Sequence, residues 1–302
     1  MIPLIVLAVA FGVTVALVVV SAVFGEQRPL DTERPERWVV HHAPEALRPA
    51  LRRVDRRIVG GVAVAASLVV VAAGGIAVGT IFDAVDNDRG IANWDESAAE
   101  WGANNATDAS TRVLRAFTHL GGTAGLLVIL VSIGAVLYLR RRSWGPVLYL
   151  LIVGVGVAGL NNILKFVVDR DRPTVAQFAG HSGSSFPSGH SAAAAACWAA
   201  IALVVFRRAS RRTRGVAAAG AVFIAVGVAA TRVLLGVHWL TDVIAGVIVG
   251  WSWFGLVTLV FGGRLLRLGE PAERVARGVD EPTVDRDSAD VPDLHPSEAS
   301  AR

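Results

Sequence analysis

Lysine and cysteine are almost absent from this chain of 302 residues. Cys197 is the only cysteine, which excludes a disulfide framework and any metal site built from several thiolates. Lys165 is the only lysine among 29 basic residues, and the rest are arginines. Charged residues make up only 18% of the chain, with 53% hydrophobic residues and a mean hydropathy of +0.53. This composition excludes an ordinary soluble domain of the same size.

The hydrophobic residues are concentrated in seven long runs. Each run is close to the roughly 20 residues that a helix needs to span a bilayer. The first run could instead be a signal peptide, but it lacks a basic start and exceeds the usual apolar length, which favours a retained span. The runs cover about residues 2–24, 58–82, 118–139, 146–168, 190–206, 215–236 and 238–262.

The arginines lie mainly in alternate connections between the runs. Eight fall in residues 25–57, three in 140–142 and five in 207–214, and these segments share one side of the membrane if all seven spans form. The loops of the other side hold five basic residues. The positive-inside rule places the Arg-rich side in the cytoplasm, with the N-terminus outside and the C-terminus inside. The clusters favour anionic lipid headgroups over nucleic acid.

These patterns predict an all-α fold: a polytopic transmembrane helical bundle with a six-helix core and one extra N-terminal transmembrane helix. Residues 1–57 would hold the extra helix and an Arg-rich cytoplasmic linker, and residues 58–263 the core. Residues 264–302 are polar and predict a disordered cytoplasmic tail. The acidic outer segment 83–117 contains IANWDESAAEW, which favours an amphipathic helix at the membrane interface.

Polar side chains gather where the predicted spans end on the outer side. Lys165 and Arg172 follow each other at the end of the fourth span, on the side where basic residues are otherwise sparse. Charged groups at the edge of a membrane span are costly unless paired or hydrated, so they indicate function. Snorkelling of a basic side chain is the alternative. The choice of lysine in an arginine-rich chain favours an anion site.

The stretch SFPSGHS carries a second candidate group at the start of the fifth span. Ser188 is a plausible N-cap there, and the free amides of a helix N-terminus can bind an anion. Gly189 permits close approach, and His190 lies in the first turn. A histidine at an interface is otherwise a common polar anchor.

A third group joins the sixth and seventh spans. Arg232 closes the sixth span, and His238 and Asp242 are four residues apart at the start of the seventh. That spacing places both on one helix face, where Asp242 can accept from one ring nitrogen and leave the other as a base or nucleophile. A His–Asp pair that only stabilises a helix end is the alternative.

Three motifs in order carry a resemblance to a known family. They are Lys-x6-Arg-Pro at 165–173, Pro-Ser-Gly-His at 187–190 and Thr-Arg-x5-His-x3-Asp at 231–242. The arrangement resembles the type 2 phosphatidic acid phosphatase superfamily, which also includes vanadium haloperoxidases and glucose-6-phosphatase. The family's serine before arginine is Thr231 here, which keeps the hydroxyl. The resemblance covers about residues 83–262.

The resemblance implies a metal-independent hydrolase of a lipid phosphate or diphosphate, with no cofactor. The distribution of arginines places the site on the extracytoplasmic face, and the near-exclusive use of Arg with the Ala, Val and Gly bias suggests a bacterial cell membrane. The resemblance makes His238 the nucleophile, Asp242 its orienting partner and His190 the general acid. The residues that would hold the phosphate oxygens are Lys165, Arg172, Ser188, Gly189 and Arg232. The alternatives are a phosphotransferase and a non-catalytic lipid-phosphate binder or transporter, and the sequence leaves the oligomeric state open.

Three further polar residues lie on the outer side without a motif. Arg170 is an expected auxiliary contact to the anion. His119 and His181 are expected to have no catalytic role.

Overall fold

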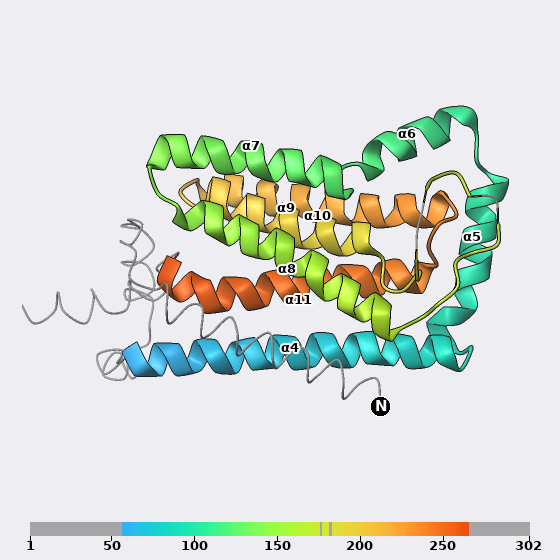
Figure 1. Cartoon of the computed structure of the whole chain (residues 1–302), viewed down its shortest axis with the longest axis horizontal. Helices are drawn as coiled ribbons and strands as arrows, with labels where there is room; N and C mark the ends of the chain where they lie inside the picture. The colour runs from blue at the N-terminus through green and yellow to red at the C-terminus, as the bar shows by residue number, and fades with distance from the viewer. Residues whose placement is uncertain (1–55, 176, 181–182, 266–302) are drawn as a thin grey trace, which may run out of the picture. The chain divides into compact units, whose positions relative to one another are not determined.

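The structure is a computed structural model that describes residues 56–175, 177–180 and 183–265. Within these residues the chain forms helices and no β-strand (Figure 1). They are α4 (Arg56–Asp86), η2 (Gly90–Trp94), α5 (Asp95–Asn104), α6 (Asp108–Thr118), α7 (Thr123–Arg141), α8 (Gly145–Val167), α9 (Gly189–Phe206), α10 (Arg211–Leu234) and α11 (Leu240–Leu265).

Six of these helices, α4 and α7 to α11, are long and apolar enough to cross a membrane. The prediction of an all-α, polytopic membrane bundle with six core helices is therefore confirmed. The extra span predicted at 2–24, the linker up to residue 55 and the tail from residue 266 lie outside the described residues. The domain boundaries at 57 and 263 stay predictions.

Helix α9 lies among α7, α8, α10 and α11 and packs against all four. Its alanines are small enough for close contact, and Ala192, Ala195 and Ala196 are almost fully buried. Helix α11 meets it through Gly246 and Gly250, a small-xxx-small pair typical of close helix packing in membranes. A Cβ atom on Gly246 would lie 2.5 Å from the carbonyl oxygen of Ser188. The start of α9 is therefore seated directly on α11.

Large side chains whose polar atoms are hydrogen-bonded fill the interior between α8 and α11. Trp253 of α11 packs over Gly156 of α8 and donates from Nε1 to the carbonyl of Val153 at 3.1 Å. Tyr149 is fully buried, and its hydroxyl lies 2.7 Å from Oγ1 of Thr258. These contacts join α8 and α11, which together carry residues of two of the three motifs.

The segment predicted as one interfacial helix is divided. A short 3-10 helix ends at Trp94, and α5 begins with Asp95, which is buried. Helix α6 follows with a capping box between Thr107 and Ser110. The predicted span at 118–139 begins only at Thr123, because the amides of residues 119–122 turn back to carbonyls of residues 116–119.

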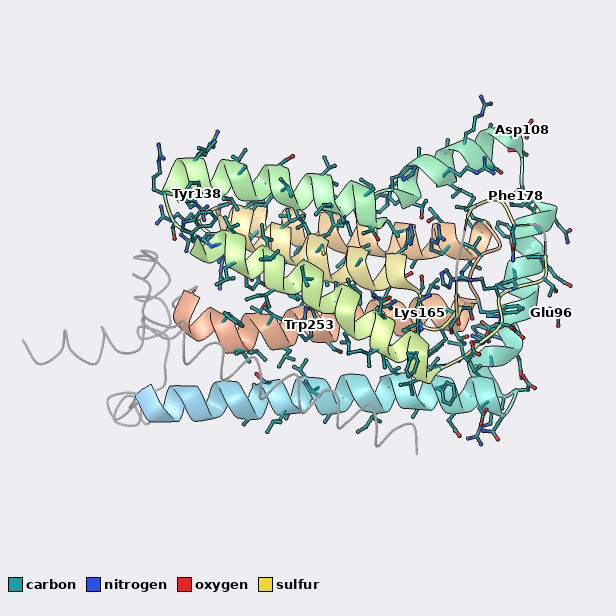
Figure 2. All side chains as sticks on the ribbon, viewed as in Figure 1. Glu96, Asp108, Tyr138, Lys165, Phe178 and Trp253 are labelled. Atoms are coloured by element: carbon teal, nitrogen blue, oxygen red, sulfur yellow. The ribbon has the colours of Figure 1, made fainter. Side chains whose placement is uncertain are left out.

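All three motifs lie at one end of the bundle. The C-terminal ends of α8 and α10 and the N-terminal ends of α9 and α11 meet there, beside α5 and α6 (Figure 1). Figure 2 shows Lys165 and Phe178 at this end, and Tyr138 near the far end of α7. The turns at the far end carry Arg140–Arg142 and the arginines of 207–214.

Candidate active site

The loop between α8 and α9 is fixed to its own ends by serine side chains. The hydroxyl of Ser184 donates to the carbonyl of Val168 and accepts from the amide of Arg170. Ser185 is fully buried; its amide donates to the carbonyl of Arg170 and its hydroxyl to that of Asp171. A loop whose buried polar groups are all hydrogen-bonded is held in one conformation. The two arginines of this loop, Arg170 and Arg172, therefore have fixed positions.

Lys165 and Arg172 point at the same backbone oxygen. The Nζ of Lys165 donates to the carbonyl of Ser184 at 2.5 Å, and Nη2 of Arg172 donates to it at 3.3 Å. Nη1 of Arg172 donates to the carbonyl of Val237 at 2.6 Å. The first motif is thereby joined to the third, and two cations are held side by side.

Ser188 is the N-cap residue of α9, as expected, but its side chain does not cap the helix. Its hydroxyl is fully buried and accepts from Ser191, and its amide donates to the carbonyl of Asp242 at 3.0 Å. Next to it, a Cβ atom on Gly189 would come within 3.1 Å of Nδ2 of Asn161. The second motif therefore fits against α11 and α8 with little spare room.

His238 lies between a carboxylate and a guanidinium. Its Nδ1 is 3.4 Å from Oδ2 of Asp242, and its Nε2 is 3.3 Å from Nη1 of Arg172. An ionised carboxylate only accepts, so Nδ1 carries the proton and the lone pair of Nε2 faces Arg172. The side chain of His238 is 3% exposed. Nε2 is therefore the ring nitrogen that carries the lone pair, and it lies against the Arg172 guanidinium.

Burial decides the charge of this imidazole. Removal from water lowers the pKa of His238 to about 4, Asp242 opposes that shift, and the charges of Arg172 and Arg232 add to it. The ring is therefore neutral at neutral pH, as a nucleophile must be. Burial also lowers the pKa of Arg172, while Asp242 raises it.

Asp242 is held by a network that the sequence did not reveal. Its Oδ1 accepts from Nη1 of Arg170 at 2.6 Å, and its Oδ2 accepts from the amide of Trp239 at 3.0 Å. Nη2 of the same Arg170 donates to Oδ2 of Asp95 at 2.8 Å. Asp95 also accepts from the amide and the hydroxyl of Thr241. The guanidinium of Arg170 thus bridges two buried carboxylates, and its contact with the anion stays a prediction.

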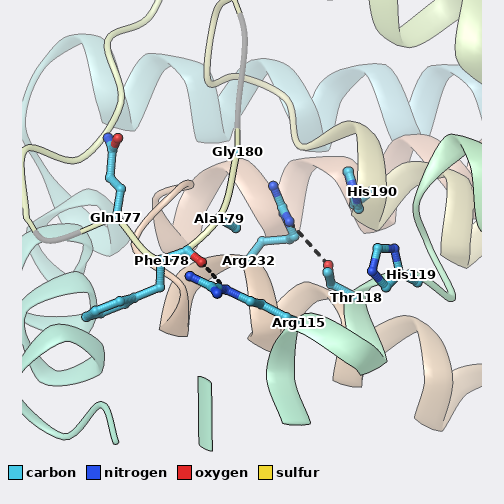
Figure 3. A pocket seen from close by; sticks show the side chains of 9 residues that line it. All are labelled: Arg115, Thr118, His119, Gln177, Phe178, Ala179, Gly180, His190 and Arg232. Carbon is cyan, nitrogen blue, oxygen red and sulfur yellow. Dashed lines mark hydrogen bonds between the residues drawn. The ribbon is translucent and has the colours of Figure 1, made fainter. Parts of the chain in front are cut away.

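Arg232 approaches the site from α10. It is 3% exposed, its Nη1 donates to Oγ1 of Thr118 at 3.2 Å, and its Nε has no hydrogen-bond partner in the described part of the chain. A buried guanidinium with an unused donor is a strong site for an anion. Arg232 and His190 line the same cavity (Figure 3).

His119 lines this cavity too, beside His190, although the sequence predicts no role for it (Figure 3). His181 lies outside the described residues. In residues 56–175, 177–180 and 183–265, no group of three or more His, Cys, Asp or Glu side chains could hold a metal ion. The motif residues come from four helix ends and two connections, with Arg172 between α8 and α9 and His238 between α10 and α11, and the fold brings them to one place.

Comparisons with known proteins agree with this architecture. A family model, the PAP2 superfamily, matches residues 144–265. Phosphatidylglycerophosphatase B of Bacillus subtilis is 37% identical over 149 residues, which cover 48% of this chain and 72% of that protein. The lipid A 1-phosphatase of Rhizobium johnstonii is 38% identical over 133 residues, which cover 40% of this chain and 50% of that protein.

A solved structure gives the same relationship in three dimensions. The crystal structure described as the first transmembrane PAP2 type phosphatidylglycerolphosphate phosphatase from Bacillus subtilis matches with a TM-score of 0.58 and 31% sequence identity. The match covers 62% of this chain and 92% of that one. The bundle is thus that of an integral membrane phosphatase, a hydrolase. The chain belongs to the PAP2 superfamily, which confirms the resemblance found in the three motifs.

Proposed function

We propose that this protein hydrolyses a lipid phosphate or lipid diphosphate through a phosphohistidine intermediate. The observation that supports this most directly is the position of His238, neutral and buried, with Nδ1 toward Asp242 and Nε2 toward Arg172. A purely structural His–Asp pair would not need its second ring nitrogen directed at a cation.

In the first half of the reaction, Nε2 of His238 attacks phosphorus. The bond from phosphorus to the lipid oxygen breaks, its electron pair stays on that oxygen, and His190 supplies the proton that makes the alcohol. Asp242 stabilises the positive ring that forms, as the orienting carboxylate of a catalytic triad does. His190 must start this step protonated and His238 neutral.

In the second half, water attacks the phosphohistidine. His190 takes a proton from the water, the water oxygen bonds to phosphorus, and the electron pair of the P–N bond returns to Nε2. Inorganic phosphate leaves and His238 is neutral again. Phosphoryl transfer depends mainly on positioning and on stabilising the equatorial oxygens. Lys165, Arg172 and Arg232 supply that charge, with the Gly189 amide at the start of α9.

Ser188 has a narrower role than the family pattern implies. Its hydroxyl is buried against Ser191. We therefore assign it to seating α9 on α11 in this state of the site, with the neighbouring Gly189 amide as the phosphate contact.

The orientation follows the arginines. The far end of the bundle carries Arg140–Arg142 and the five arginines of 207–214, so it belongs in the cytoplasm by the positive-inside rule. The site then faces the outside, and the tail of the substrate can stay in the outer leaflet. The name of the Bacillus subtilis relative suggests phosphatidylglycerol phosphate as a test substrate.

The test is phosphate release by the purified, detergent-solubilised protein with EDTA present. Phosphatidic acid, phosphatidylglycerol phosphate and undecaprenyl diphosphate are the substrates, and His238→Ala is the matched inactive variant. We expect release that survives EDTA and is lost in the variant, with phosphate trapped on His238 after an acid-free quench. Release that needs a divalent ion, or that persists in His238→Ala, would exclude this mechanism; phosphate passed to an added alcohol but not to water would indicate a transferase.

A further inference from the structure

The cavity that contains His190 and Arg232 extends beyond the motif residues. Its volume is about 420 Å³, within the range of about 300–1,000 Å³ typical of small-molecule sites. One phosphoryl group needs only a small part of this space. The remaining wall is formed by the end of α6 and by residues 177–180 (Figure 3).

Arg115 is the cation of this second wall. Its Nε donates to the carbonyl of Phe178, and its Nη1 and Nη2 have no hydrogen bond to any residue in the described ranges. The amide of Phe178 donates to the carbonyl of Leu235 at the end of α10. The guanidinium is thus held at its base, and its two terminal nitrogens remain for a ligand, the geometry that suits a two-point contact with phosphate oxygens.

Helix α6 connects the two arginines of the cavity, Arg115 and Arg232. Arg232 is bonded to Thr118, and Arg115 lies three residues earlier on α6, which is about one helical turn. The cavity is lined by two arginines, Arg115 and Arg232, and its described lining includes no carboxylate. A wall of this charge favours a second anion next to the transferred phosphoryl group.

We propose that Arg115 binds a second anionic group of the substrate headgroup, separated from the reacting phosphate by a short polar link or by none. The substrate class is then a lipid with two phosphates at its polar end, rather than a simple phosphomonoester such as phosphatidic acid. This inference rests on the proposed function, because it places the reacting phosphate at His190 and Arg232. Gln177 and His119 also line this cavity and carry polar side chains.

The experiment compares kcat/KM for phosphatidylglycerol phosphate and phosphatidic acid of the same acyl length, in the same detergent. Arg115→Ala removes the cation, and Arg115→Gln keeps a donor toward Phe178 while removing the charge. Arg112→Ala is the matched control, since Arg112 lies one turn earlier on α6, bonds only the carbonyl of Asp108 among the described residues and does not line the cavity. We expect the preference for the two-phosphate lipid to fall about tenfold in both Arg115 variants, the effect of one lost charge-assisted hydrogen bond, and to be kept in Arg112→Ala.

An unchanged preference in both Arg115 variants, or an equal fall in Arg112→Ala, would overturn the proposal. Binding of soluble headgroups separates it from the proposed function. Calorimetry with glycerol 1,3-bisphosphate and glycerol 3-phosphate gives an affinity ratio that needs no turnover. A protein that binds the bisphosphate more tightly, and loses that advantage in Arg115→Gln, has the subsite even if it releases no phosphate; equal binding of the two compounds by the unaltered protein refutes the subsite even if hydrolysis occurs.

Discussion

Asp95→Asn tests whether the network behind His238, the proposed nucleophile, acts on catalysis or only on stability. The change removes one negative charge and keeps the size of the side chain. Asp95 accepts from Nη2 of Arg170 at 2.8 Å and from the amide and hydroxyl of Thr241 at 2.8 and 2.6 Å. The new amide can still accept from the Thr241 amide, but its NH2 group would face the Arg170 donor.

The expected loss of stability follows from these contacts. One buried charge-assisted hydrogen bond is lost, which corresponds to about 2–3 kcal/mol in the free energy of unfolding. Arg170 keeps its bond to Asp242, so the loss stays below the roughly 3–5 kcal/mol of a fully broken buried ion pair. We expect a lower unfolding temperature in detergent.

The expected loss of activity follows from charge. In the proposed mechanism the His238 ring becomes positive in the transition state, and the negative charge of Asp95 stabilises it through Arg170 and Asp242. The chain of contacts from Asp95 to His238 extends over roughly 10 Å, so one charge contributes about 1–2 kcal/mol at an effective dielectric constant of about 20. That corresponds to a kcat about tenfold lower with KM nearly unchanged, and to a His238 pKa below its value of about 4.

The assay is the pH profile of kcat and KM, together with thermal unfolding, for the unaltered protein, Asp95→Asn and Glu96→Gln. Glu96 is the adjacent residue of α5, exposed, and its change removes the same charge. We expect Glu96→Gln to behave as the unaltered protein in each measurement. Asp95→Asn with reduced stability but an unchanged kcat and acid limb would refute the reasoning and leave Asp95 a purely structural residue.

Two further predictions concern packing and pH. Gly246→Ala places a Cβ atom 2.5 Å from the Ser188 carbonyl, so we expect a stability loss of about 1–3 kcal/mol and a kcat reduced up to about 100-fold as α9 shifts; Gly159→Ala, with open space around its Cβ, should leave both unchanged or slightly raise stability. Because burial depresses the pKa of His238 from 6.5 to about 4, the folded state binds fewer protons than the unfolded state. The free energy of unfolding of the protein should therefore not depend on His238 above about pH 6.5. It should fall by about 3 kcal/mol as the pH drops toward 4, because the unfolded state takes up the proton first. His238→Gln should lose that part of the pH dependence in unfolding measurements, and an unchanged dependence would contradict the assignment.

Much of the fold could be predicted from residue type alone. Six apolar runs became six spanning helices because bilayer thickness sets helix length, and the motif residues fell at matching helix ends because alternate ends of sequential spans share a side. The start of α7 was missed by five residues, since the apolar character continues through a turn made by Gly121 and Gly122.

The long-range polar contacts could not be predicted in the same way. Asp95 stands among other acidic residues of the segment 83–117, and nothing in its neighbours marks it as the one that reaches Arg170, 75 positions later. Arg115 and His119 likewise belong to no motif, and the last turn of α6 and its C-cap bring them to the cavity. A carboxylate pair for Arg170 could have been sought, however, because a second partly buried arginine beside Arg172 requires a counter-charge.

The carbonyl of Ser184 has a consequence for turnover. In the free protein this one oxygen accepts from both Lys165 and Arg172. If Lys165 and Arg172 bind the phosphate as proposed, its arrival exchanges these hydrogen bonds for new ones, and its departure lets both side chains return to the Ser184 carbonyl. In the proposed mechanism the carbonyl therefore competes with inorganic phosphate for the two cations and favours product release.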